Sequence, residues 1–474
     1  MVKIFQTLLI FITSLLLAAC GGGGGGGGSS GEAVGGGAIP QCSENASYVD
    51  GEYNFMGNGG TYTSTNLYGL GSVCASAAYG RGATGDGQLI AVLDSGISVG
   101  EGTTTDLNQI NSNIATFLTG SDVINSDNVP QDDDNNNNTA LGSGHGSHVA
   151  GLIANEHNNS SFGGHGIAYD ATLHIIKVLD EDGSGSFAQI AAGMDLARGV
   201  SSMDIVNLSL GSSGVIGSTC DSASSCETAL GSTIYTAMEA LGSASIIQVY
   251  AAGNDGNSSP NTLAGAAIYD DDFKETTVIA VAIDSTGNLA SYSDKCGVAK
   301  AICIAAPGSS LYSFFSSNAQ SSYAVDSYAQ SMSGTSQAAP LVSGGLALIK
   351  QEFSSLTNAQ VIDRLLATAL DTGEYSKSTI YGHGLMNLNG ATAAVAKLQT
   401  INGSNLLDDP NTSYYDLAHN SFLSSAAFSN ALNNALAGHT MEVYDSFDRA
   451  NFDVAVNSFF TSGSYTSQNT IENH

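Results

Sequence analysis

Short apolar runs alternate with helix-like segments between Leu89 and Leu388. The runs are rich in Val, Ile and Leu and predict strands at 89–94, 173–180, 203–211, 245–254 and 276–284. Their almost continuous apolar content is typical of strands that are buried on both faces. Helices are predicted at 187–200, 228–242 and 336–351. The alternation predicts an α/β fold with a mostly parallel central sheet and helices on both faces.

The segments on either side of this region have different patterns. Lys3 and the apolar run from Leu8 to Ala19 have the layout of a secretory signal over residues 1–19, and the run is shorter than the roughly 20 residues that a membrane span needs. Glycine dominates residues 21–37, so we expect 20–40 to be a flexible tether. Residues 41–84 are predicted to begin the main domain, 85–395 to form its body and 396–474, with a helical candidate at 421–437, to be a C-terminal extension.

Composition narrows the choice of partners. The chain has 43 acidic and 12 basic residues and a formal net charge of −31. Such an excess of negative charge argues against nucleic acid and anionic membrane surfaces as partners. Few Lys and Arg with abundant Gly, Ser, Asn and Asp are typical of a secreted bacterial surface protein.

The chain has seven cysteines. Cys20 closes the apolar leader, which leaves an even number, as expected for disulfides in an exported chain. Among fifteen connectivities, neighbours in the sequence favour three local pairs: Cys42–Cys74, Cys220–Cys226 and Cys296–Cys303. No CxxC pair occurs, so the sequence gives little support to a zinc or thioredoxin-like site.

Polar residues stand where the predicted strands and helices meet. Ligands of open parallel sheets bind beyond the carboxyl ends of the strands. Asp94 ends the first run, Asn254 ends the fourth, His145 precedes a helix in "GHGSHVAGLIA", and Ser336 begins another in "SGTSQAAP". Considered one at a time, each of these residues could also be an ordinary turn residue or a helix N-cap. His145 and His148 suggest a metal pair, but no third ligand is in register.

Taken together, these residues carry a stronger signal. Asp94, His145 and Ser336 follow the chain order of the subtilisin triad. The pieces "VLDSGI", "GHGSHVAG", "NLSLG", "AAGNDG", "APG" and "SGTSQAAP" occur in one order over roughly residues 85–395. The chain therefore resembles the subtilisin-like serine proteases, also called subtilases or the peptidase S8 family.

The resemblance implies a role for each residue. Ser336 would attack the scissile carbonyl, His145 would act as general base and then acid, and Asp94 would orient the imidazole. Asn254 and the Ser336 backbone N–H would form the oxyanion hole. No cofactor is required for this chemistry.

The resemblance also implies a substrate-binding cleft. Its two walls would be formed by Ser209, Leu210 and Gly211, which would pair with the substrate backbone, and by Ala251, Ala252 and Gly253. Asp255 either favours a basic P1 residue or is simply solvated. The acidic run at 130–138 is compatible with a structural calcium site, as is common in the family, or with a solvated loop, since it lacks EF-hand spacing.

Both ends of the chain bear on where the enzyme would act. "LLLAAC" resembles the lipobox of bacterial lipoproteins, which implies lipidation of Cys20 and an anchor in the outer membrane. Residues 441–454 resemble the segment after the protease domain of autotransporter serine proteases. A translocating barrel needs at least eight strands of about ten residues, and no such series is present here. The usual folding propeptide is not recognisable.

The sequence thus predicts a serine endopeptidase that is tethered to the cell surface and processes exported proteins. One alternative is a general degradative protease, released to the medium. Another is a non-catalytic adhesin on the same fold, which the retained triad and Asn254 disfavour.

Overall fold

The computed structural model describes most of the predicted main domain. The described residues are 68–97, 113–132, 144–156, 165–180, 182–314 and 329–393, and further on 395, 398–401, 414–416, 438, 440–445 and 450–455. The predicted signal peptide, the tether with Cys20, and Cys42 lie outside them, as do residues 133–138 of the acidic run and the helical candidate at 421–437.

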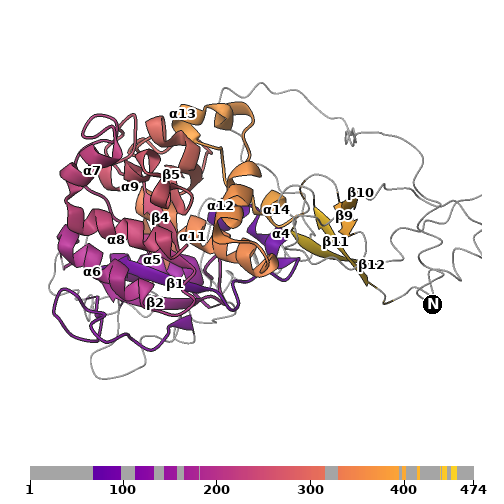
Figure 1. The fold of residues 1–474 in the computed structure, drawn as a ribbon, viewed down its shortest axis with the longest axis horizontal. Helices are drawn as coiled ribbons and strands as arrows, with labels where there is room; N and C mark the ends of the chain where they lie inside the picture. The colour runs from indigo at the N-terminus through magenta and orange to yellow at the C-terminus, as the bar shows by residue number, and fades with distance from the viewer. Residues whose placement is uncertain are drawn as a thin grey trace, which may run out of the picture. The chain divides into compact units, whose positions relative to one another are not determined.

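A six-stranded, wholly parallel sheet forms the centre of the domain (Figure 1). Its strands are β1 (Leu89–Asp94), β2 (Thr172–Lys177), β3 (Ile205–Leu208), β4 (Ile247–Ala251), β5 (Thr277–Ile283) and β6 (Cys303–Pro307), in the order β2-β1-β3-β4-β5-β6. Every residue of β3, β4 and β5 is buried, as the apolar runs predict, and so is every residue of β6. The structure confirms the predicted α/β fold class.

Two pairs of helices cover opposite faces of this sheet. The helices are α5 (His145–Ala154), α6 (Phe187–Arg198), α8 (Ser232–Ser243) and α11 (Thr335–Glu352). In β4, the Gln248 side chain donates to a carbonyl of α8, whereas the neighbouring Asn207 in β3 accepts from Ser343 of α11. Gln248 lies beside Val206, one residue before Asn207, so the two contacts are on opposite faces. The helix α6 packs on α8, and α5 packs on α11 (Figure 1).

The elements differ from the sequence predictions mainly at their ends. The helix predicted at 228–242 is two helices, α7 (Ala223–Leu230) and α8, because Gly231 between them has φ 90°, outside the helical region. The strand predicted at 173–180 ends at Lys177, and the one predicted at 203–211 ends at Leu208. The strand β6 was not predicted, because its alanine-rich sequence lacks a strong β signal.

Smaller elements complete the described part of the chain. They are α3 (Tyr68–Ser72), α4 (Ala75–Tyr79), α9 (Thr262–Gly265), η2 (Ala266–Tyr269), α10 (Asp271–Lys274), η3 (Gly297–Ile302), β7 (Leu311–Phe314), β8 (Ala329–Met332), α12 (Asn358–Ala367), η4 (Gly373–Ser376), α13 (Ser378–Tyr381) and α14 (Leu388–Ala391). In the predicted extension, β9 (Leu398–Ile401), β10 (Tyr414–Asp416), β11 (Thr440–Asp445) and β12 (Asn451–Ala455) form an antiparallel sheet. None of the described helices has the length and apolar content that a membrane span requires.

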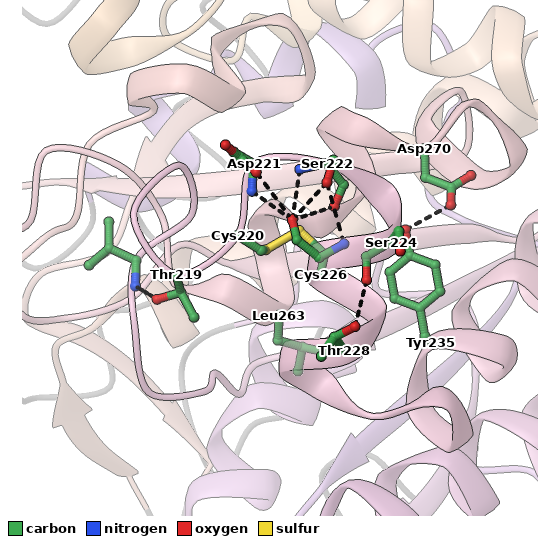
Figure 2. The surroundings of a disulfide bond; sticks show 12 residues. Thr219, Cys220, Asp221, Ser222, Ser224, Cys226, Thr228, Tyr235, Leu263 and Asp270 are labelled. Atoms are coloured by element: carbon green, nitrogen blue, oxygen red, sulfur yellow. Dashed lines mark hydrogen bonds between the residues drawn. A yellow bond between two sulfur atoms is a disulfide. The ribbon is translucent and has the colours of Figure 1, made fainter.

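Disulfides cross-link the domain locally. Cys220–Cys226 and Cys296–Cys303 are bonded, which confirms two predicted pairs. Cys74 is also disulfide-bonded, while its predicted partner Cys42 lies outside the described residues. Figure 2 shows that the Cys220–Cys226 bond lies at the start of α7, where Ser222 and Ser225 form a capping box.

Candidate active site

Asp94 and His145 form a hydrogen-bonded pair. Asp94 is the last residue of β1 and is fully buried, and its Oδ1 accepts the Ser95 backbone N–H at 2.8 Å. The same oxygen lies 2.7 Å from Nδ1 of His145, whose side chain is 18% exposed. A carboxylate can only accept, so Nδ1 carries the hydrogen and Nε2 of the neutral ring is left as an acceptor. His145 is the first residue of α5, whereas the sequence prediction placed it just before the helix.

The surroundings of His145 act on its pKa in opposite directions. Burial lowers the pKa, but the negative charge of Asp94, the hydrogen bond to it and the charge of Asp132 raise it more, and the pKa lies above its ordinary 6.5. The imidazolium form is therefore stabilised. This suits a group that must accept a proton during a reaction.

Ser336 lies at the start of α11 and is bonded reciprocally to Ser209. It is the second residue of the helix, whose N-cap is Gly334, so the N-cap interpretation of Ser336 does not hold. Its Oγ donates to the Ser209 carbonyl at 3.1 Å, and Ser209 Oγ donates to the Ser336 carbonyl at 2.8 Å. That carbonyl lacks its usual helical donor, because residue 340 is proline and has no N–H.

Asn254 is held in one orientation by Thr335. Its Oδ1 accepts the Thr335 backbone N–H at 2.8 Å and the Thr335 hydroxyl at 3.0 Å. The amide nitrogen Nδ2 is therefore available as a donor to another group. A Cβ placed on Gly334 would lie 3.5 Å from both Asn254 Nδ2 and the Ser336 backbone nitrogen, and 2.8 Å from Gln337 Oε1. Both donors therefore lie near one point beside Gly334, which the Gln337 side chain also approaches.

The two predicted substrate walls lie at the carboxyl ends of β3 and β4 and are joined by Asn261. Asn261 Nδ2 donates to the carbonyls of Ala251 and Ala252 at 3.0 and 2.9 Å, and Oδ1 accepts the Ser212 N–H at 3.2 Å. The same Nδ2 lies 3.0 Å from where a Cβ of Gly211 would be. A single buried amide thus spans the gap between the two segments.

Asp294 supports the turn that carries Asn254. This buried carboxylate accepts the backbone N–H groups of Asn257, at 2.6 Å, and of Asp255, at 3.3 Å. Burial raises its pKa, and the hydrogen bonds from Asn257 partly offset this. Gly253 has φ 121°, and a Cβ there would lie 2.2 Å from Asp294 Oδ2, so only glycine fits. Asp255 itself is exposed.

Sequence reasoning missed the residues that orient this site. These residues lie 10 to 81 positions along the chain from the groups that they contact here, and no local pattern distinguishes them from ordinary turn or helix residues: Thr335, Asn261, Asp294 and Asp132. Thr335 is the exception, since it stands beside Ser336 in "SGTSQAAP".

No described residue at this site forms a cation-binding group. His148 Nε2 donates to the Leu311 carbonyl in β7 at 3.0 Å. In the described part of the chain, a single acidic trio has the spacing of a cation site, Glu239, Asp270 and Asp272. Asp270 already accepts the Tyr235 hydroxyl at 2.7 Å, as Figure 2 shows.

Comparison with known proteins identifies the family. The subtilase family model matches residues 85–384. Subtilisin DY of Bacillus licheniformis is 34% identical over 326 residues, which is 68% of this chain and 97% of that protein. Subtilisin Savinase of Lederbergia lenta is 35% identical over 325 residues, or 69% and 98% of the two chains. Subtilisin E of Bacillus subtilis is 34% identical over 331 residues, or 70% and 72%. The chain therefore belongs to the subtilase family and is a subtilisin-like serine protease.

Proposed function

We propose that Asp94, His145 and Ser336 are the catalytic triad of this endopeptidase. The observation that carries the proposal is the 2.7 Å bond between a fully buried carboxylate and a histidine whose second ring nitrogen is left as an acceptor. Ser336 is in the first turn of α11, which packs on α5, the helix that begins with His145. Its hydroxyl bonds the Ser209 carbonyl in the free enzyme. In the reaction this hydroxyl would have to leave the Ser209 carbonyl and turn toward His145, which a change to another staggered χ1 rotamer would allow.

The triad would work as follows. Ser336 Oγ attacks the substrate carbonyl while His145 Nε2 takes its proton, and the imidazolium then gives that proton to the leaving amine. Water then attacks the acyl-enzyme by the same steps, with His145 again acting as base and then as acid. Asp94 keeps the proton on Nδ1 throughout and stabilises the positive ring. No cofactor takes part in these steps.

Asn254 Nδ2 and the Ser336 N–H would hold the oxyanion in the space beside Gly334. Thr335 fixes the amide oxygen, so the amide group needs no reorientation when charge develops. The walls at Ser209–Gly211 and Ala251–Gly253 would hold the substrate chain by backbone pairing, with its P1 side chain between them.

A fluorophosphonate probe tests the triad directly. The chain from residue 21 is compared with Ser336→Ala and with Ser232→Ala, which alters an exposed serine at the start of another helix. We expect the wild type and Ser232→Ala to be labelled and to cleave unfolded casein, and Ser336→Ala to do neither. Labelling of Ser336→Ala would disprove the assignment. A folded wild type that neither labels nor cleaves would favour the non-catalytic adhesin.

We further propose that the protease is exported and anchored by lipid at Cys20, from which it processes neighbouring exported proteins. The leader "LLLAAC" and the formed disulfides support export and an oxidising environment. The several acyl chains of a lipoprotein would make anchoring stable, and the glycine tether would let the domain reach its substrates.

Metabolic labelling with an alkynyl fatty acid tests the anchor. We expect label and membrane fractionation in the wild type and loss of both in Cys20→Ala. An unlabelled wild type in the medium would favour the degradative protease. Comparison of surface-protein N-termini between cells with wild type and Ser336→Ala then separates the two roles, because processing produces a few defined new termini and degradation produces many.

A further inference from the structure

Asp132 is a buried carboxylate close to the Asp94–His145 pair that the chemistry above does not use. Its exposed fraction is 2%. Oδ1 accepts the Ser95 hydroxyl at 3.0 Å, and Oδ2 accepts the Ser147 hydroxyl at 2.8 Å and the Ser147 backbone N–H at 3.4 Å. Both carboxylate oxygens are therefore satisfied by serines from two different elements.

Those two serines flank the pair itself. Ser95 directly follows Asp94 at the end of β1, and Ser147 is two residues after His145 in α5. The Ser95 hydroxyl also accepts the Gly146 N–H at 2.9 Å, so one hydroxyl links the strand end, the helix start and Asp132. A Cβ on Gly146 would lie 2.2 Å from the Gly96 carbonyl oxygen, which shows how closely the two backbones approach here.

Three charged groups face Asp132 from the surrounding elements. They are Asp94 on β1, Lys177 on β2 and His145 on α5. Lys177 is almost fully buried, and its Nζ donates to the Ser95 carbonyl at 2.7 Å. Burial raises the pKa of Asp132, the charge of Asp94 raises it further, and the Ser147 bond, the charge of Lys177 and the Ser95 bond lower it; the resulting pKa is about 6. The group is thus ionised above about pH 6.

We propose that Asp132 is a positioning residue. Through Ser95 and Ser147 it fixes the end of β1, which carries Asp94, relative to the start of α5, which carries His145. It also places a second negative charge near the imidazole. The inference rests on the proposed triad, since it assigns Asp132 a part in that reaction. Asp132 touches neither substrate nor the reacting atoms. It acts by fixing the position and the charge state of His145.

The charge of Asp132 gives the proposal a signature that a purely structural role lacks. It is one of the causes that raise the pKa of His145. Asp132→Asn keeps the shape and one accepting oxygen but removes the charge, so the pKa of His145 falls. The acid limb of kcat/KM, which reports neutral His145, then moves to lower pH.

The first measurement is an NMR titration of His145 in the Ser336→Ala background, which needs no activity. We expect the pKa of His145 to be lower in Asp132→Asn than in the parent. The control is Asp122→Asn, which neutralises another buried aspartate, one bonded to Asn125 and not among the causes of the His145 shift. The control is expected to leave the pKa unchanged. An unchanged pKa in Asp132→Asn would overturn the proposal.

Kinetics of the active enzyme provide the second measurement. In Asp132→Asn we expect kcat to fall on the order of 10- to 100-fold with little change in KM, as for small misplacements of a catalytic group. Ser147→Ala removes the shortest bond to Asp132. Because that bond lowers the pKa of Asp132, the measurement is made well above pH 6, where the carboxylate stays ionised. We expect kcat to fall there although the charge is still present. This variant keeps the test available if Asp132→Asn does not fold. Wild-type kcat in Ser147→Ala would contradict the positioning role. If the wild type is inactive but the pKa of His145 still depends on Asp132, the result counts against the proposed function and not against the positioning role.

Discussion

The two sides of the site differ in the charge and the burial of their side chains. On the β1–α5 side, Asp94, His145 and Asp132 are charged or chargeable and mostly buried, and they are held by hydrogen bonds between side chains. On the β4–α11 side, Asn254 and Ser336 are neutral, and Asn254 is exposed on its turn. The charged side controls a proton, and the low dielectric of its buried position strengthens the electrostatic interactions that do so. The neutral side offers fixed dipoles to an oxyanion, which must be reachable by the substrate.

The largest expected effect comes from a change on the neutral side, at Asn254. Asn254→Ala removes one oxyanion donor, and we expect kcat to fall about 10²–10³-fold with little change in KM, the loss known for the matching asparagine of subtilisin itself. Steady-state kinetics on a peptide anilide measure it. Fluorophosphonate labelling should slow but persist, because Ser336 and His145 are intact; an unchanged kcat would remove Asn254 from the site.

A smaller effect tests how Asn254 is held. Thr335→Val keeps the shape of the side chain and the backbone N–H donor but removes the hydroxyl that bonds Asn254 Oδ1. One lost hydrogen bond of about 1.4 kcal/mol corresponds to roughly a tenfold fall in kcat. In the double variant with Asn254→Ala, the Thr335→Val effect should shrink, because the amide is gone and only the bond from the Gly253 N–H to the Thr335 hydroxyl remains to be lost. Full additivity would contradict this link.

The pH profile tests the charged side. His145 must be neutral to act as a base, and Asp94 and Asp132 raise its pKa above 6.5, so kcat/KM should rise with pH and reach half its plateau above pH 6.5. Asn254→Ala serves as the comparison, because a change on the neutral side should lower the plateau without moving this midpoint. A wild-type midpoint at or below 6.5 would mean that burial, and not the two carboxylates, dominates.

Much of the fold could be predicted because it depends on local pattern. The buried strands β1, β4 and β5 are mostly apolar, and such a run is a property of neighbouring residues. Predictions failed where a single residue or a weak signal decided the outcome. Gly231 splits one predicted helix in two, and alanine-rich β6 gains its strand conformation from pairing with β5.

The sequence by itself determined the family, the α/β class and the candidate roles of Asp94, His145, Ser336 and Asn254, because the residue types and their order carry the chemistry. Only the tertiary structure revealed what orients them. Asp132 meets Ser95 across 37 residues, Asn254 meets Thr335 across 81, and Ser209 meets Ser336 across 127. Such contacts form where parallel strands end side by side at one edge of a sheet. No local pattern of residues records which strands those will be.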